Sequence, residues 1–252
     1  MPPKKLSILF TSSWYPTEKD PVLGNFVKRH AEAVATLHDT WAVYVTSVPP
    51  GFEGNYVRFY EENGVKTFRC FYTKGWVPAF NRWLALRKSI KWIKNKKGGR
   101  FDMVHHSMIW PDGWQPWWLR MIWGTPFIVS ENWTGFDTDE RGYPGWIATN
   151  ASRIFGRSAR FLCPVTDNLA RSMQKLGIKK DSPEDYRIVP NVVDTDLFSL
   201  HNPPAGKPFR FLHISSLLDQ HKNISGLLRS FSRALKHNNE LHLTIAGDGS
   251  SA

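Results

Sequence analysis

The sequence predicts an α/β protein built on a Rossmann-like, doubly wound parallel sheet, and two observations lead to this prediction. Short apolar runs recur along the chain, and stretches with helical spacing lie between them. Strands that alternate with helices need crossover connections, which favour a mainly parallel sheet. The expected strands are residues 6–10, 41–46, 65–71, 101–107, 126–131, 160–166, 186–190, 209–215 and 242–247.

Three stretches between these strands repeat apolar residues at the spacing of a helix with one buried face: residues 24–39, 167–177 and 223–236. The expected buried faces are Val27, Ala31, Val34 and His38 in the first, Leu169, Met173 and Leu176 in the second, and Ile224, Leu227, Leu228, Phe231 and Leu235 in the third. The residues expected at the helix ends are the N-caps Asn25, Asp167 and Asn223, and Gly177 after the second helix.

Residues 201–208 (HNPPAGKP) form the clearest seam in the chain. They hold three prolines and a glycine, a composition that interrupts regular structure and suits a linker. Residues 1–200 carry enough expected strands for a full Rossmann-like domain. Residues 209–252 offer two strands and one helix, which leave much apolar surface uncovered. We therefore expect them to be the incomplete start of a second Rossmann-like domain.

The charge balance favours anionic partners. Lys and Arg outnumber Asp and Glu by 33 to 22, giving a net charge of +11, which attracts nucleic acid, anionic membranes or phosphorylated substrates. No nucleic-acid-binding motif accompanies this charge, so we expect no nucleic-acid partner. The two cysteines, Cys70 and Cys163, have no metal-site spacing and favour a reducing compartment. The protein is therefore expected in the cytoplasm.

Much of the positive charge lies in one expected helix, residues 82–97. Trp83, Leu86, Ile90 and Ile93 form an apolar stripe in it, and the basic residues beside the stripe are Arg87, Lys88, Lys91 and Lys94. Such a helix can rest on an anionic membrane surface, which would make the protein peripheral on the inner face of the membrane. The same pattern fits an ordinary crossover helix with its lysines in water.

Six segments in chain order resemble motifs of one protein family. The segment YRIVPNVVDTDLF resembles the I-P-N-G-V-D-x-x-x-F turn of nucleotide-sugar glycosyltransferases with the two-Rossmann GT-B fold, specifically the large retaining family 4. In the first part of the chain, YPTEKDPVLGNFVKRHAEAVA resembles the family's glycine loop and following helix, FDMVHHS its D-x-V-H-x-H strand, and FIVSENWTGF its T-E-H-W strand end. Further on, FLHISSLLDQHKNISGLLRSF resembles the opening of the donor domain, and LTIAGDG resembles the G-D-G turn.

The resemblance, which runs from about Leu6 to Gly249, implies an enzyme of the hexosyltransferase type that serves polysaccharide biosynthesis. Residues 1–200 would bind a glycan or lipid-linked acceptor, and the second domain would bind the donor. In the family, the G-D-G turn is followed by further strands and helices, including an E-x-F-G-x-x-x-x-E segment whose glutamates contact the nucleotide ribose and the donor sugar. That segment does not follow Gly249, so the chain is expected to be a fragment that is inactive alone.

The implied donor is a nucleoside diphosphate sugar, with no metal and no other cofactor. Its departing diphosphate gains negative charge, which cations and backbone N–H groups can stabilise. In the family an arginine and a lysine grip the diphosphate; Lys222 matches the lysine, and Ser216 stands where the arginine is expected. The remaining expected donor contacts come from the glycine loop and the G-D-G turn: Gly24, Asn25, Gly247 and Gly249.

Four polar residues follow two of the expected strands and are the candidate catalytic residues. His105 and His106 end one strand, and Glu131 and Asn132 end the next. Because the carboxyl ends of parallel strands share one edge of a sheet, we expect them to converge there with Gly24. The family commonly has a histidine in place of Asn132, reaching the donor sugar's hydroxyls; an amide can form those hydrogen bonds but cannot titrate. Glu131 either acts as an acceptor-side base or supports a loop.

Two alternatives stay open. The pairs Asp137/Asp139 and Asp194/Asp196 have the spacing with which metal-dependent GT-A transferases hold Mn²⁺ or Mg²⁺, although both lie in turn-like sequence, where aspartate bonds local backbone. The second alternative is a non-catalytic module that binds a glycan or a phospholipid and transfers nothing.

Overall fold

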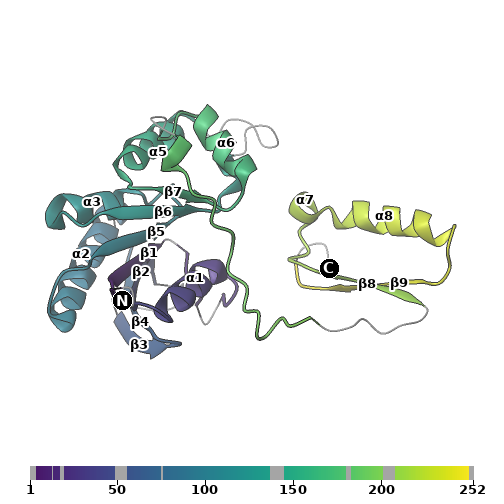
Figure 1. Ribbon diagram of the computed structural model, residues 1–252, viewed down its shortest axis with the longest axis horizontal. Coiled ribbons are helices and arrows are strands. Elements are labelled where there is room, and N and C mark those ends of the chain that lie inside the picture. The colour runs from purple at the N-terminus through teal and green to yellow at the C-terminus, as the bar shows by residue number, and fades with distance from the viewer. Residues whose placement is uncertain are drawn as a thin grey trace. The chain divides into compact units, whose positions relative to one another are not determined.

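The computed structural model describes residues 4–12, 14–17, 20–48, 56–74, 76–136, 145–179, 183–200 and 208–249. The chain divides into two compact units, Met1–Asp194 and Thr195–Ala252 (Figure 1). The division falls ahead of the predicted linker, of which residues 201–207 lie outside the described part. No helix within the described ranges is long and apolar enough to cross a bilayer.

The first unit is built on one seven-stranded sheet in the order β3-β4-β2-β1-β5-β6-β7. Neighbouring strands pair in parallel except β3, which is antiparallel to β4. The strands are β1 (Ser7–Ser12), β2 (Asp39–Ser47), β3 (Tyr56–Glu62), β4 (Val65–Tyr72), β5 (Met103–Ser107), β6 (Phe127–Glu131) and β7 (Leu162–Pro164). The predicted Rossmann-like α/β fold is therefore confirmed.

Two strand predictions differ from the structure. The edge strand β3 was not expected, although Asn63 and Gly64, which join it to β4, are a hairpin signal. The expected strand over residues 186–190 does not form: only Tyr186 bridges to Leu162. The N–H of Val189 still donates to the carbonyl of Pro164, so the segment runs beside β7 without completing a ladder.

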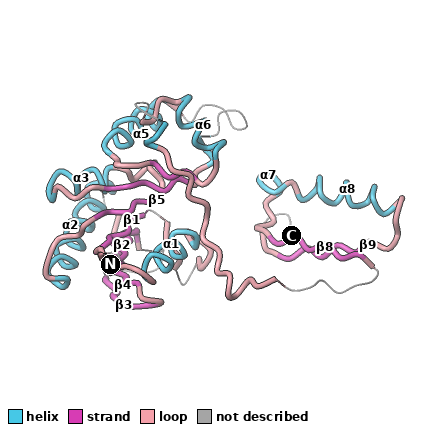
Figure 2. The backbone as a smooth tube through the Cα atoms, viewed as in Figure 1, coloured by secondary structure: helices cyan, strands magenta, loops and turns pink. Residues whose placement is uncertain are grey.

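Helices cover both faces of this sheet (Figure 2). The helices are α1 (Asn25–Ala35), α2 (Pro78–Lys97), α3 (Trp114–Trp123), α5 (Trp146–Ser158) and α6 (Asp167–Lys175), with single 3₁₀ turns at Thr134–Phe136 and Pro183–Asp185. Alternation along β1 sends Leu9 into the core beneath α2, whereas Ile8 and Phe10 pack with α1 on the other face. This is the doubly wound arrangement.

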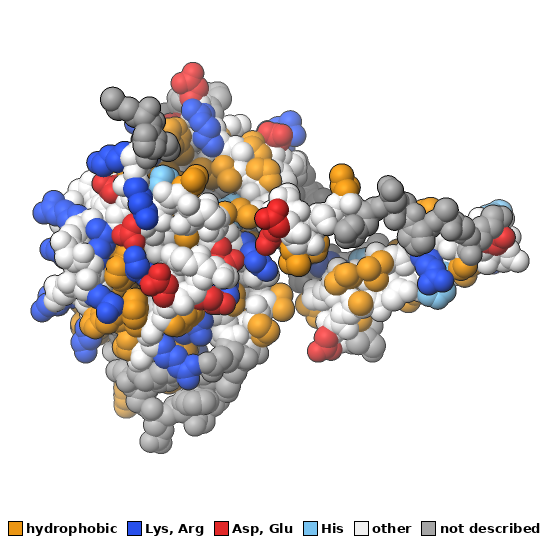
Figure 3. Space-filling model, turned by 60° about the horizontal axis from the view of Figure 1, so that its bottom comes forward, with side chains coloured by type: hydrophobic (Ala, Val, Ile, Leu, Met, Phe, Trp, Pro, Cys, Tyr) orange, Lys and Arg blue, Asp and Glu red, His pale blue; other side chains and the backbone are white. Residues whose placement is uncertain are grey.

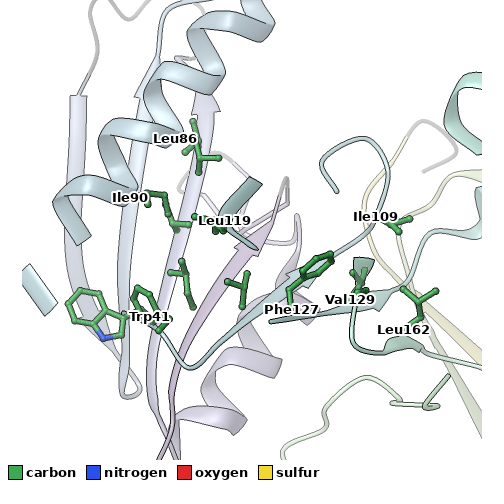
Figure 4. Packing of buried hydrophobic residues seen from close by; sticks show 14 of the residues in the cluster. Trp41, Leu86, Ile90, Ile109, Leu119, Phe127, Val129 and Leu162 are labelled. Atoms are coloured by element: carbon green, nitrogen blue, oxygen red, sulfur yellow. The ribbon is translucent and has the colours of Figure 1, made fainter. Parts of the chain in front are cut away.

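The apolar stripe of α2 belongs to the core. Leu86, Ile90 and Ile93 are at most 2% exposed and pack with Trp41 of β2 and with Leu119 of α3 (Figure 4). These three residues are therefore not available to lipid, whereas Trp83, the fourth residue of the stripe, is half-buried. Helix α2 is a crossover helix. Its basic residues Arg87, Lys88, Lys91 and Lys94 remain exposed.

The capping predictions are partly wrong. Gly24, in the left-handed conformation with φ 67°, precedes α1 instead of Asn25. Thr166 rather than Asp167 caps α6, because its side chain accepts from the N–H of Leu169. The Asn223 prediction is confirmed, since its side chain accepts from the N–H of Gly226.

The second unit pairs β8 (Phe209–Ile214) in parallel with β9 (Leu241–Ala246) and adds α7 (Asp219–Lys222) and α8 (Ile224–Leu235). The stripe predicted to be buried on α8 is mostly not: Ile224 is buried, whereas Leu228 and Leu235 are exposed. Two strands, one short helix and one longer helix supply too few layers to cover each other. Figure 3 accordingly shows hydrophobic side chains on the surface of this unit.

Candidate functional site

Polar side chains gather at the carboxyl ends of three adjacent parallel strands, β1, β5 and β6. Oγ1 of Thr11 on β1 lies 2.7 Å from Nδ1 of His106 on β5. Oγ of Ser130 on β6 lies 2.7 Å from Nε2 of His105. Because consecutive strand residues face opposite sides, the two imidazoles leave the sheet in opposite directions. His105 faces α1, with its ring centroid 6.3 Å from that of His30.

Both strand-end histidines are held neutral. Burial lowers the pKa of His105 to about 3, and the neighbouring His30 and His106 add to the shift. Burial also lowers the pKa of His106 to about 4, while the Asp112 carboxylate opposes the shift. Neutral imidazoles at pH 7 offer one donor and one acceptor each, so this edge provides hydrogen bonds rather than positive charge.

Glu131, at the end of β6, forms hydrogen bonds with the backbone of the loops that follow β5 and β6. Its Oε2 accepts from the N–H of Ile109 at 2.9 Å, and its Oε1 accepts from the N–H groups of Asn132 at 3.0 Å and Trp133 at 2.8 Å. The residue is fully buried, and burial raises its pKa to about 7 against the effect of these bonds. The loop-supporting geometry is therefore present; the role of an acceptor-side base stays a prediction.

Asn132 is joined to a distant loop of the same unit. Its Nδ2 donates to Oδ1 of Asn191 at 2.8 Å, and its own Oδ1 is buried without a hydrogen-bond partner among the described residues. Burial lowers the pKa of His30 on α1, and the adjacent Asn191 side chain opposes that shift. We call Asn132, Asn191, His30, His105 and Ser130 the amide–imidazole cluster. It links Asn132 to His105 through Asn191 and His30.

Gly24 and Asn25 lie at the start of α1, the helix that also carries His30. A Cβ on Gly24 would lie 2.5 Å from the carbonyl carbon of Trp14. The glycine is thus required by the approach of the chain's own backbone. Asn25 lines a pocket with Tyr15 and Arg69, separate from the cluster residues.

The expected donor residues of the second unit meet at the carboxyl ends of β8 and β9. A Cβ on Gly247 would lie 1.9 Å from the carbonyl oxygen of Ser215, and one on Gly249 2.7 Å from the backbone of Leu217. The G-D-G turn therefore packs against the loop that contains Ser216, which is exposed. Lys222, also exposed, ends α7. Diphosphate binding by these residues stays a prediction.

The N-terminus of α8 is occupied by a side chain of this chain. Oδ1 of Asp219 accepts from the N–H of Ser225 at 2.7 Å, and Oδ2 accepts from its hydroxyl at 2.8 Å. These bonds lower the pKa of Asp219. A diphosphate approaching this helix end beside Lys222 would meet a carboxylate, a feature that the sequence did not indicate.

No group of three or more potential metal-ligating side chains occurs in the described ranges. Asp137 and Asp139 lie outside those ranges, and Asp194 and Asp196 are exposed in a loop. Sequence reasoning also missed three cluster members, His30, Asn191 and Ser130. Two of these residues could have been found from the sequence. His30 sits beside Ala31, a residue of the predicted buried face of α1, and Asn191 lies inside the YRIVPNVVDTDLF motif.

Comparison with known proteins identifies a family. The sequence profile of Glycosyltransferase Family 4 matches residues 23–197. No curated protein matches the chain by sequence.

Two solved structures resemble the chain at low sequence identity. One is the catalytic domain of starch synthase IV from Arabidopsis thaliana bound to ADP and acarbose, with 11% identity, 98% of this chain and 69% of that chain covered, and a TM-score of 0.59. The other is a UDP-forming α,α-trehalose-phosphate synthase from Burkholderia xenovorans in complex with glucose-6-phosphate, with 12% identity, coverage of 97% and 66%, and a TM-score of 0.60. The chain thus spans about two thirds of each.

At these identities the likeness shows the fold, a Rossmann-like half of a GT-B protein. The family profile covers more than half of the chain. The chain therefore belongs to glycosyltransferase family 4.

Proposed function

We propose that this protein takes part in retaining transfer of a hexose from a nucleoside diphosphate sugar to a glycan or lipid-linked acceptor, with the first unit binding the acceptor. The observation that carries the proposal is the Asn132–Asn191 contact at the carboxyl edge of the sheet. There Oδ1 of Asn132 is buried and has no partner among the described residues. A buried acceptor without a donor is costly, and a sugar hydroxyl would supply that donor.

The chemistry of the amide–imidazole cluster suits carbohydrate. A sugar hydroxyl both donates and accepts hydrogen bonds, and neutral amides and imidazoles do the same. Burial keeps His105 neutral, with its pKa at about 3, so the cluster adds no charge that a neutral sugar would have to match. Ligand sites of open parallel sheets lie at this edge.

The second unit is proposed to hold the donor diphosphate. Lys222 would supply an ammonium, and exposed backbone around Ser216 and the G-D-G turn would supply N–H groups. No metal or other cofactor enters the proposal, because these groups can offset the charge that develops on the departing diphosphate.

The proposal includes attachment to an anionic membrane at the cytoplasmic face. Its support is the exposed basic side chains of α2, Arg87, Lys88, Lys91 and Lys94, together with exposed Trp76 and Phe80 near the start of that helix. Such mixed surfaces favour anionic lipid.

A glycan-binding module without transferase activity is the second candidate. The buried position of Glu131, with both oxygens engaged by backbone N–H groups, favours it, because no proton acceptor is then offered at the end of β6.

One experiment separates the two. Release of nucleoside diphosphate and labelling of acceptors are measured with UDP-, GDP- and ADP-hexoses in the presence of membrane extract, and the anomeric configuration of the product is read by NMR. Acceptor-dependent release with retained configuration supports the transferase. Glycan binding that no nucleotide sugar alters supports the module, and inversion at the anomeric carbon contradicts retention.

A further inference from the structure

A basic pocket lies beside α1, apart from the residues of the amide–imidazole cluster. Its volume is about 740 Å³, and residues of the first loop, of α1 and of β3 and β4 line it. The lining residues used below are Tyr15, Asn25, Arg58, Tyr60 and Arg69.

Two arginines stand directly opposite each other on this pocket. Arg58 on β3 and Arg69 on β4 are register partners in the antiparallel pair, so their side chains leave the same face of the sheet. Like charges in directly opposite positions destabilise a strand pair. An anion between or beside them would turn the repulsion into attraction.

The guanidinium of Arg69 is buried and incompletely used. The residue is 6% exposed. One terminal nitrogen donates to the carbonyl oxygen of Pro16 and to the hydroxyl of Tyr60, the latter at 3.0 Å. Its Nε has no hydrogen-bond partner among the described residues. Buried charges are normally paired, so this donor indicates an absent acceptor.

Glu62, the acidic residue in the described lining of the pocket, is not the acceptor for Nε of Arg69. Oε2 of Glu62 accepts from Nζ of Lys28 at 2.9 Å. The start of α1 adds a further favourable field: its first turn holds no acidic residue, and no side chain caps it. Helix N-termini stabilise anions, and Asn25 brings this one into the pocket lining.

We propose that this pocket binds a phosphate-type oxyanion carried by the acceptor. Arg69 offers Nε, Arg58 approaches from the opposite strand, and the Tyr60 hydroxyl and the α1 N-terminus complete the donor set. Guanidinium groups match the oxygens of phosphate in geometry as well as charge. Helix α1 supplies Asn25 to this pocket and His30 to the cluster, so an acceptor can span both. That the anion belongs to the acceptor rests on the proposed function; oxyanion binding itself does not.

The test is binding of inorganic phosphate to the 252-residue chain without any donor, followed by thermal unfolding and by the NMR signal of the Arg69 Nε–H. The informative variants are Arg58→Gln, which keeps the buried arginine in place, and Asn25→Asp, which places a carboxylate at the helix N-terminus. A purely structural role predicts that Asn25→Asp stabilises the fold and leaves phosphate binding unchanged. Lys91→Gln on α2 is the control for net charge.

We expect phosphate to shift the Arg69 signal and raise the midpoint of unfolding of the wild type and of Lys91→Gln. Affinity should fall about tenfold or more in both pocket variants, as expected for loss of a charge-assisted hydrogen bond. Tighter binding of a sugar phosphate, or of vesicles containing phosphatidic acid, than of inorganic phosphate identifies the source of the anion. An unmoved Arg69 signal, or equal affinity in all four proteins, overturns the proposal even if glycosyl transfer is observed.

Discussion

Nδ2 of Asn132 lies 2.8 Å from Oδ1 of Asn191, which joins the end of β6 to a loop 59 residues later in the chain. Both amides belong to the first unit, and the second of them lies beside His30 of α1. Three segments distant in sequence are thereby fixed around one sheet edge. Substitutions at these residues therefore test whether the contacts between the three segments stabilise this edge of the sheet.

We expect the two amides to be coupled in stability. Asn132→Ala and Asn191→Ala each leave a polar partner unpaired, so each should lower the free energy of unfolding by about 1 kcal/mol. Because they remove the same bond, the double variant should lose less than the sum. Urea unfolding of the four proteins measures this; strict additivity would show that the contact carries no energy.

Gly24 should tolerate no side chain. In Gly24→Ala the Cβ would lie 2.5 Å from the Trp14 carbonyl carbon, and φ is 67°. The matched control is Gly98→Ala, with φ 75° and nothing within 4 Å of the new Cβ. The control should lose about 1 kcal/mol from backbone strain, and Gly24→Ala clearly more. Equal losses in thermal unfolding would remove the packing explanation.

Glu131→Gln should destabilise the protein more at pH 5 than at pH 8. Burial raises the folded-state pKa of Glu131 from 4.5 to about 7. Because the pKa is higher in the folded state, the protonated carboxyl stabilises the fold at pH values below 4.5, the pKa of the unfolded state. This stability is lost as the pH rises through 7. Between pH 5 and 7 the difference amounts to about 2–3 kcal/mol. Urea unfolding of both proteins at the two pH values measures it, and a pH-independent difference would place the pKa elsewhere.

The buried histidines should weaken the fold in acid. The pKa of His106 falls from 6.5 to about 4 on burial. Depressed values give stability that is present above pH 6.5 and lost as the pH falls towards 4, by about 1.4 kcal/mol per pH unit for each histidine. His106→Gln should flatten this slope. A slope unchanged by the substitution would mean that His106 titrates normally.

Membrane attachment through α2 predicts a charge-dependent interaction with lipid. Arg87→Glu/Lys91→Glu should abolish sedimentation with phosphatidylglycerol vesicles, whereas Arg233→Glu/Lys236→Glu on the second unit should not, because it has the same charge change on another surface. Neither protein should sediment with phosphatidylcholine. Equal binding by both double variants would exclude α2 as the contact.

The buried part of the fold was predictable because its strands are continuous apolar runs. Edge strand β3 was missed since Arg58, Glu61 and Glu62 interrupt its apolar residues. The spacing of α8 predicted a buried stripe, because helical spacing records which residues share a face and not what covers them; the small number of strands in the second unit was the better guide to its exposure. Residues 186–190 have strand composition, but they form only one bridge, at Tyr186, and separate backbone hydrogen bonds to β7 instead of a ladder.

The sheet edge could be expected to gather His105, Glu131 and Asn132, since parallel strands end together. The pairing of Asn132 with Asn191 depends on a loop conformation that no periodicity encodes. The same holds for Gly24, whose glycine is required by Trp14, ten residues earlier, rather than by a ligand. Asp219 at the start of α8 likewise follows from the fold of a short turn.

The most direct test of the account is glycosyl transfer by the wild type, Asn132→Ala, Asn191→Ala and the α2 surface control Asn95→Ala, with the same nucleotide sugar and acceptor. Loss of a hydrogen bond to the sugar should lower kcat/KM about 10- to 100-fold in the first two variants and leave Asn95→Ala unchanged. Wild-type rates in both cluster variants would contradict the assignment of this edge as the sugar-binding site.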